Sequence, residues 1–210
     1  MGTVQKILCY GDSLTAGYCC KGLKFIPYST SLKQTLSDEY GLNVDIHHHG
    51  YSGWTAREMK RCIDEENVED FTGNNGPGLR TALQKNYDLL ILMAGTNDLG
   101  FGESVENIFE NIRYMMDVSL QRKISVLNIG IPDSSCKVSV VTKKRDSVNT
   151  LLKKHAKTTP NLTYITCPVE YSKTSGYYDP DGLHFSESGY SLLGRELGKH
   201  VFQSLNVVEK

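Results

Sequence analysis

The amino-acid sequence predicts an α/β fold in which helices cover a mostly parallel sheet of five strands. Five short runs of apolar or β-branched residues recur along the 210 residues, and segments with helical spacing separate them. The third run, YDLLILMA at Tyr87–Ala94, is apolar almost throughout, as is typical of a strand buried on both faces of a parallel sheet. Because no internal repeat, low-complexity tract or linker interrupts the pattern, we expect residues 1–210 to form a single domain.

The expected strands alternate with helices along the chain. They are Val4–Tyr10, Asn43–His48, Tyr87–Ala94, Ile124–Ile131 and Leu162–Thr166. This alternation favours parallel pairing, because a strand that returns through a helix runs in the same direction as the strand before it. In such a sheet the carboxyl ends of all the strands lie along one edge.

Five helices are expected between and after these strands, at Pro27–Tyr40, Thr55–Val68, Glu103–Gln121, Val141–Lys157 and Ser186–Leu205. The first has a proline near its start and Gly41 where a helix would stop. The second begins with Thr55 and has Glu58 three residues later, the spacing of a capping box. The breaker cluster GNNGPG at Gly73–Gly78 follows it and predicts a loop.

Composition excludes several classes of function. The 23 Lys and Arg residues nearly balance the 24 Asp and Glu residues, without long runs of one sign, so no nucleic-acid partner is expected. No apolar run reaches the length of a membrane span, and Met1–Lys6 contains no apolar signal core, so we expect no membrane insertion and a cytoplasmic location. The six cysteines lack the spacing of a disulfide framework and are expected to be reduced thiols.

Polar residues and glycines gather where the expected strands end. The blocks are GDSL at Gly11–Leu14, GYSGWT at Gly50–Thr55, GTND at Gly95–Asp98 and, before the last helix, DGLH at Asp181–His184. Because the carboxyl ends of parallel strands share an edge, the first three blocks converge there although they lie far apart in sequence. We expect the fourth to reach the same edge.

The residue types in these blocks are those that acyl transfer requires. A serine becomes a nucleophile when a base removes its proton, and an imidazole base needs a partner that fixes its tautomer, so we assign these roles to Ser13, His184 and Asp181. The oxyanion donors would be the N–H groups of Ser13 and Gly53 and the amide of Asn97. Each residue also has an ordinary explanation, because serine and asparagine occur in turns, glycine supplies positive φ, and a histidine can cap a helix.

Together the four blocks resemble those of the SGNH hydrolases, the GDSL family of esterases and lipases, and in the same order. The resemblance covers nearly the whole chain and implies a three-layer α/β/α sandwich that is flavodoxin-like in outline. It places the family's serine, glycine and asparagine at Ser13, Gly53 and Asn97, and its Asp and His at Asp181 and His184. It also implies hydrolysis of carboxylic esters without a metal or organic cofactor.

Other residues are expected around this site. Trp54, directly after the oxyanion glycine, is expected to narrow or line the acyl site, and Phe101 to border it. Asp12 and Asp98 are expected to hold loops. The polar segment Arg61–Leu79 shapes either an opening to the site or an oligomer contact, and the sequence does not choose between them. The three histidines of HHH, residues 47–49, are not expected to bind metal, because neighbouring residues of a strand point to opposite faces.

The leading hypothesis is therefore a serine esterase that acts through an acyl-enzyme on a small, short-chain ester. The same constellation also serves a thioesterase, a lysophospholipase, a carbohydrate deacetylase or an acyltransferase. A non-catalytic flavodoxin-like module that binds phosphate or a nucleotide is the alternative from another class, although the chain lacks Gly-x-Gly-x-x-Gly and the P-loop pattern. A homo-oligomer remains open.

Overall fold

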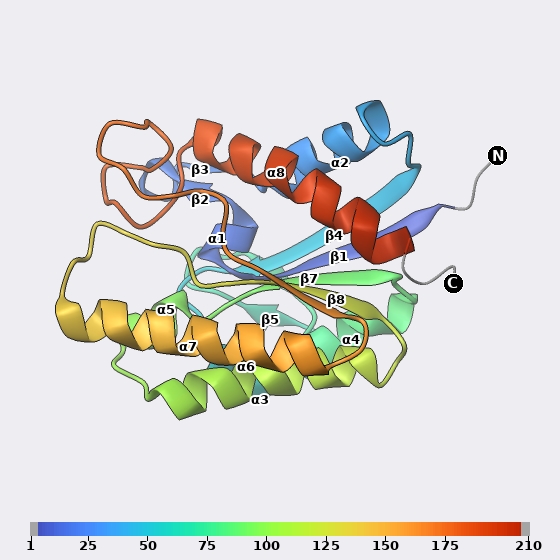
Figure 1. Ribbon diagram of the computed structural model, residues 1–210, viewed down its shortest axis with the longest axis horizontal. Coiled ribbons are helices and arrows are strands. Elements are labelled where there is room, and N and C mark those ends of the chain that lie inside the picture. The colour runs from blue at the N-terminus through green and yellow to red at the C-terminus, as the bar shows by residue number, and fades with distance from the viewer. Residues whose placement is uncertain (1–3, 207–210) are drawn as a thin grey trace.

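A computed structural model describes residues 4–206 of the chain and contains the expected five-stranded parallel sheet between two layers of helices (Figure 1). The strands lie in the order β4-β1-β7-β8-β9. Their bounds are Gln5–Asp12 for β1, Val44–Tyr51 for β4, Leu89–Met93 for β7, Ser125–Ile129 for β8 and Leu162–Ile165 for β9. The α/β sandwich predicted from the sequence is confirmed. Residues 1–3, part of the segment in which no export signal is expected, and 207–210 lie outside the described residues.

The strand order reverses beside β1, the first strand of the chain. β1 pairs with β4 on one side, from Gln5 opposite Val44 onward, and with β7 on the other, from Ile7 opposite Leu89 onward. The chain therefore builds the sheet outward in both directions from β1, and the loops that follow β1 and β7 separate at their carboxyl ends. Ligands of open α/β sheets bind at such a reversal.

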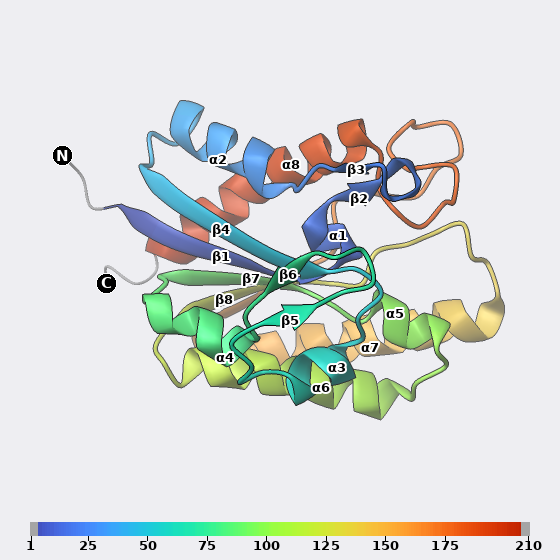
Figure 2. The same cartoon turned by 180° about the vertical axis from the view of Figure 1, so that it is seen from behind.

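Helices cover the two faces in separate groups (Figures 1 and 2). On one face lie α2 (Ser29–Asp38) and α8 (Glu187–Asn206), and on the other α3 (Ala56–Arg61), α4 (Leu79–Ala82), α6 (Val105–Leu120) and α7 (Ser139–Thr158). Successive strand residues feed the two cores alternately, since Ile7 and Ile91 pack with the first group and Leu8 and Leu90 with the second. Both faces of the sheet are therefore buried under helices, as the apolar run of the third strand predicts.

The prediction of a helix at Thr55–Val68 is wrong in its length. The helix ends at Arg61, and Val68–Glu69 forms β5, which pairs with β6 at Asn75–Gly76 inside the segment that was expected to be only a loop. The buried Asp70 explains this hairpin, because its carboxylate accepts hydrogen bonds from the N–H groups of Ser52, Thr72 and Asn74. The bond from Ser52 ties the hairpin to the loop after β4, and Figure 2 shows the hairpin beside that end of β4.

The sequence also did not predict several other short elements. These are α1 (Ser13–Ala16), β2 (Tyr18–Cys19), the 3₁₀ turn η1 (Cys20–Gly22), β3 (Lys24–Phe25), α4, η2 (Leu83–Lys85) and α5 (Thr96–Gly100). Most of them lie at the carboxyl edge of the sheet, so the unpredicted structure is concentrated around the expected site.

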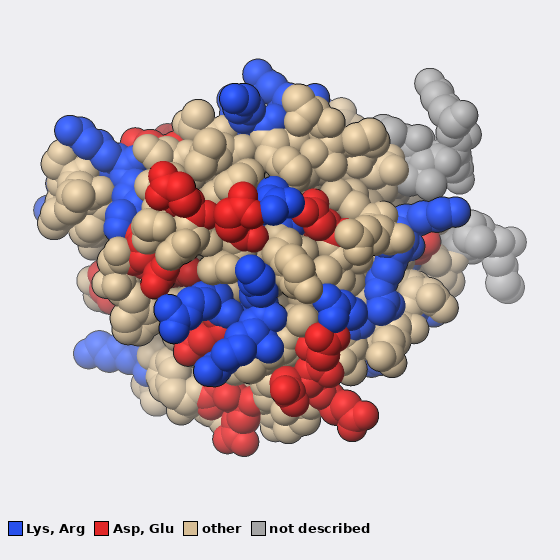
Figure 3. Space-filling model, turned by 90° about the horizontal axis from the view of Figure 1, so that it is seen from below, with Lys and Arg blue, Asp and Glu red and all other residues tan. Residues whose placement is uncertain are grey.

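The surface carries mixed charge. Seen from below, acidic and basic side chains are interspersed over the helices that lie lowest in Figure 1, and neither sign covers that face alone (Figure 3). Among the described residues, no helix combines the length and the apolar character that crossing a membrane requires.

Candidate active site

Ser13 lies at the junction of β1 and α1. The Asp12 carboxylate caps α1 by accepting a hydrogen bond from the N–H of Leu14 at 3.0 Å, and Gly17 ends the helix with a φ of 80°. α1 packs directly on β4, where a Cβ at Gly50 would lie 2.1 Å from the backbone nitrogen of Ala16. The absence of a side chain at Gly50 therefore allows α1 to hold Ser13 at the tip of the central strand.

The loop before α8 brings His184 and Asp181 to Ser13, as the sequence predicts. Nε2 of His184 lies 2.9 Å from Oγ of Ser13, and Nδ1 lies 2.8 Å from Oδ2 of Asp181. Between them, Gly182 has a φ of 66° and donates its N–H to the carbonyl of Asp179 at 2.9 Å. This tight turn lets a carboxylate three residues before the histidine bond the same ring.

The partners of His184 define its tautomer. An ionised carboxylate only accepts hydrogen bonds, so Nδ1 carries a proton donated to Asp181, and Nε2 of the neutral ring accepts from the Ser13 hydroxyl. Burial opposes ionisation of Asp181, but hydrogen bonds from the His184 ring and from the N–H groups of Leu183 and His184 outweigh it and lower the pKa of Asp181. This arrangement is suited to proton removal from Ser13.

Gly53 and Asn97 come from the loops after β4 and β7. Gly53 has a φ of 81°, and among residues 4–206 its N–H donates to no protein acceptor. Nδ2 of Asn97 donates to the carbonyl of Trp54 at 2.8 Å, which uses one of its two N–H groups. Donors from the loops after β4 and β7 therefore lie at the edge of the sheet that carries Ser13, which is itself only 5% exposed.

Two buried aspartates accept backbone N–H groups of these loops. Oδ2 of Asp98 accepts the N–H of Ala56 at 2.8 Å, just after the loop that carries Gly53. Asp12 is fully buried beside the site, and burial raises its pKa to about 7, with the N–H of Leu14 opposing the shift and the nearby Asp98 adding to it. Burial also raises the pKa of Asp98.

A largely apolar pocket of about 530 Å³ opens beside Asn97. Its apolar lining includes Leu99, Phe101, Ile131, Val141 and Leu183. Leu183 directly precedes His184, so the pocket connects the asparagine loop with the histidine loop. Its size falls within the range of small-molecule sites.

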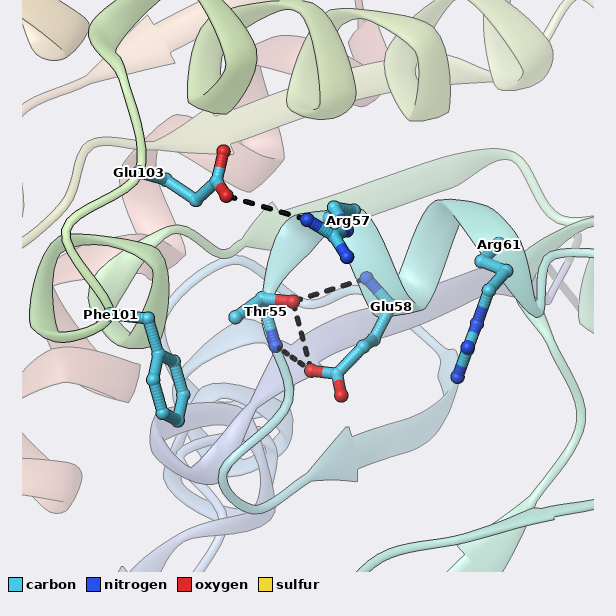
Figure 4. Close-up of a pocket in the computed structure, with 6 residues that line it drawn as sticks. All are labelled: Thr55, Arg57, Glu58, Arg61, Phe101 and Glu103. Atoms are coloured by element: carbon cyan, nitrogen blue, oxygen red, sulfur yellow. Dashed lines mark hydrogen bonds and ion pairs between the residues drawn. The ribbon is translucent and has the colours of Figure 1, made fainter.

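Phe101 is 76% exposed and separates this pocket from a smaller polar one of about 250 Å³ (Figure 4). In the polar pocket Arg57 points toward Glu103, with the ion pair at 3.5 Å. Trp54 lines neither pocket. Its ring packs on Tyr51 with centroids 5.0 Å apart.

The segment Arg61–Leu79 contributes a side chain that the sequence did not single out. Phe71, at the tip of the β5–β6 hairpin and 76% exposed, lies so close to Gly53 that a Cβ there would be 3.1 Å from its ring. Thr72 and Asn74 of the same tip line another pocket, which also includes Ala16 of α1. This segment therefore borders the expected site.

The triple histidine at residues 47–49 has separate surroundings. Nδ1 of His47 lies 2.6 Å from the hydroxyl of Tyr87, and burial lowers the pKa of His49 to about 4. Within residues 4–206, no three His, Cys, Asp or Glu side chains are grouped as metal ligands would be.

Comparison with known proteins gives the family of the chain. The model of the GDSL-like lipase/acylhydrolase family matches residues 9–192, a span that includes all four blocks. The chain belongs to this family. It is accordingly a hydrolase of ester bonds, and the resemblance drawn from the four blocks is confirmed.

Named relatives of this GDSL hydrolase include an isoamyl acetate-hydrolyzing esterase of Schizosaccharomyces pombe, 27% identical over 92% of this chain and 73% of that protein. Among solved structures, a family 3 carbohydrate esterase of Clostridium thermocellum superposes with a TM-score of 0.74 at 19% identity, covering 98% of this chain and 99% of that one. A lipase/acylhydrolase of Enterococcus faecalis gives 0.70 at 20% identity, covering 95% and 96%. At these identities the two structures show likeness of fold.

Proposed function

We propose that this GDSL hydrolase cleaves small carboxylic esters through a covalent acyl-enzyme formed on Ser13. One observation carries this function. The His184 ring is hydrogen-bonded to the Ser13 hydroxyl on one nitrogen and to the Asp181 carboxylate on the other, although Ser13 lies about 170 residues away in sequence. A nucleophile, a base and an orienting carboxylate in this order meet the geometric requirement for an activated serine.

The reaction follows from these contacts. Ser13 Oγ attacks the ester carbonyl as its proton passes to Nε2 of His184, which then gives that proton to the leaving alcohol. In the second half a water molecule attacks the acyl-serine as its proton passes to His184, which returns a proton to Ser13 Oγ as the bond to the acyl group breaks and the carboxylic acid leaves. Asp181 stabilises the imidazolium in both halves. The N–H groups of Ser13 and Gly53 and the free N–H of Asn97 would donate to the oxyanion.

The apolar pocket beside Asn97 favours an ester with a small apolar substituent. Leu99, Ile131 and Leu183 of its lining carry no charge, and Arg145, which also lines it, is paired with Asp133 and Asp146. The relative from Schizosaccharomyces pombe, which hydrolyses isoamyl acetate, supports a short acyl chain on a small apolar alcohol. Phe101, at the rim of the pocket, would contact that substituent.

The test is the hydrolysis of p-nitrophenyl esters from acetate to long acyl chains by the wild type and by Ser13→Ala. We expect activity that falls with chain length and a loss of at least ~10³-fold in kcat in the variant. Ser125→Ala, which removes a buried hydroxyl at the far end of the sheet, is the matched control and should stay active.

Two results would contradict the proposal. Full activity in Ser13→Ala would exclude Ser13 as the nucleophile. A preference for long acyl chains would exclude the short-chain assignment while leaving the nucleophile in place. Product analysis with added alcohol separates hydrolysis from acyl transfer.

A further inference from the structure

The ring of Tyr18 lies against the ring of His184. The two centroids are 4.5 Å apart and the planes are inclined by 42°, while Tyr18 itself is half-buried. The hydrogen bonds of His184 to Ser13 and Asp181 run through its two ring nitrogens. They leave the ring free to tilt about the axis that joins them, so a contact on its face supplies the missing restraint.

We propose that Tyr18 is a positioning residue that holds the His184 ring in the plane in which it can accept the Ser13 proton. This inference rests on the proposed role of His184 as the base. An aromatic face within about 6 Å also attracts a cation, so Tyr18 favours the imidazolium that forms when Ser13 attacks.

The chain fixes Tyr18 from three sides. Its carbonyl accepts a hydrogen bond from the hydroxyl of the fully buried Tyr190 at 2.8 Å. Its ring meets the edge of Phe25, its partner in the β2–β3 pair, with centroids 5.8 Å apart. It also lies over Gly22, where a Cβ would be 2.9 Å from Cε2 of Tyr18. The ring can occupy this place because residue 22 has no side chain.

The same hairpin is bonded to the loop that carries the histidine. The N–H of Cys20 donates to the Asp179 carboxylate, and the N–H of Asp179 donates to the carbonyl of His184 at 2.9 Å. Cys20 and the next residue, Lys21, both have positive φ, a conformation that side chains disfavour. The backbone of the hairpin is thus bent where it meets Asp179, and Tyr18 and His184 are held as one unit.

The experiment compares Tyr18→Leu with Tyr18→Phe. Its readouts are the rate of labelling by a fluorophosphonate and kcat and KM for p-nitrophenyl acetate. Leucine removes the aromatic face, so kcat and the labelling rate should fall about 5- to 30-fold while KM changes little. Phenylalanine keeps the face and should restore both rates to within about twofold of the wild type.

Two further variants separate positioning from a general loss of structure. Tyr40→Leu removes a half-buried tyrosine that packs on Phe202 with centroids 4.9 Å apart, at the far end of the molecule, and should leave labelling unchanged. Gly22→Ala leaves Tyr18 intact but forces its ring aside, and should slow labelling as Tyr18→Leu does; because its φ of 80° disfavours alanine, urea unfolding of this variant is measured alongside.

The outcomes distinguish this inference from the function on which it rests. A wild type that does not label at Ser13 would overturn both. A wild type that labels, together with a Tyr18→Leu variant that labels equally fast, would overturn the role of Tyr18 alone. An equal loss in Tyr18→Phe and Tyr18→Leu would also overturn it, because the hydroxyl rather than the ring face would then matter.

Discussion

The turns at the two edges of the sheet require their residue types for different physical reasons. At the amino edge, a residue with positive φ occurs shortly before each of the four sheet strands that follow β1, at Gly41, Asn86, Lys123 and Asn161. Three of these carry side chains, and a Cβ at Gly41 would meet nothing within 4 Å. These turns lie in open space, and their residues are needed only for the backbone conformation that reverses the chain.

At the carboxyl edge the glycines allow close approach. A Cβ at Gly11 would lie 2.1 Å from the carbonyl oxygen of Met93, and one at Gly95, with its φ of 110°, would lie 2.7 Å from Ile131. The connections there are also longer, and the one from β9 to α8 carries His184 and Asp181. The difference shows that one edge serves chain reversal, whereas the other packs its loops tightly enough to bring polar groups together.

The largest effect is expected from one substitution made at both edges. Asn97→Ala removes a proposed oxyanion donor and should lower kcat about 10²- to 10³-fold, which corresponds to about 2.7–4 kcal/mol of transition-state stabilisation. Asn86→Ala should leave kcat unchanged and cost about 1 kcal/mol of folding stability, because alanine disfavours its φ of 54°. Steady-state kinetics and urea unfolding measure the two quantities. Equal kcat in both variants would remove the functional distinction between the edges.

A second pair of variants compares the cost of a steric clash at the carboxyl edge with the cost of an unfavourable φ at the amino edge. Gly50→Ala places a methyl group into the backbone of α1 and should lower the free energy of unfolding by about 3 kcal/mol, with loss of activity because Ser13 is displaced. Gly41→Ala meets no neighbour and should cost about 1–2 kcal/mol for its φ of 63°, with activity retained. Urea unfolding gives both values. A larger cost at Gly41 than at Gly50 would contradict the comparison.

The smallest effect concerns the charge buried at the carboxyl edge. An unfolded aspartate has a pKa of about 3.9, whereas burial raises that of Asp12 to about 7, so the native protein keeps a proton that the unfolded chain releases. The resulting stabilisation is complete below about pH 4 and is lost as the pH rises through 7. As the pH rises from 5 to 8, the free energy of unfolding of Asp12→Asn should therefore increase by about 2 kcal/mol relative to that of the wild type.

Urea unfolding of both proteins at the two pH values measures this gain. Asp88→Asn, which replaces an exposed carboxylate at the amino edge, is the matched control. If the difference in unfolding free energy between Asp12→Asn and the wild type is the same at both pH values, or is smaller at pH 8 than at pH 5, then Asp12 is ionised in the native protein.

The comparison also explains how much of the fold the sequence predicts. All five sheet strands were predicted to within a few residues. The inner strands β7 and β8 are buried on both faces and therefore appear in the sequence as apolar runs, whereas the half-exposed edge strands β4 and β9 were found from their place in the alternation of strands and helices. The β5–β6 hairpin was not predicted, since its strands are two residues long and depend on the contacts of Asp70 with Ser52 and Asn74. Such elements are held by side chains distant in sequence, and local patterns do not report them.

In the candidate site, too, some residues could be predicted from the sequence and others could not. Ser13, Asp181 and His184 were named from the four sequence blocks, and the structure brings Ser13 and Asp181 each within hydrogen-bond distance of the His184 ring. Tyr18 and Phe71 were not named. Tyr18 reaches His184 only through a bent hairpin, and Phe71 reaches Gly53 only through the tip of another. A lone aromatic residue in a loop carries no periodic signal that would have revealed either contact.

The measurement that tests the central claim most directly is mass spectrometry of the protein quenched during turnover of p-nitrophenyl acetate. The account predicts an acetyl group on the peptide that contains Ser13, absent in Ser13→Ala and strongly reduced in His184→Ala, which lacks the base that activates Ser13. Hydrolysis that proceeds with no acyl adduct, or with an adduct on another residue, would contradict an acyl-enzyme at Ser13.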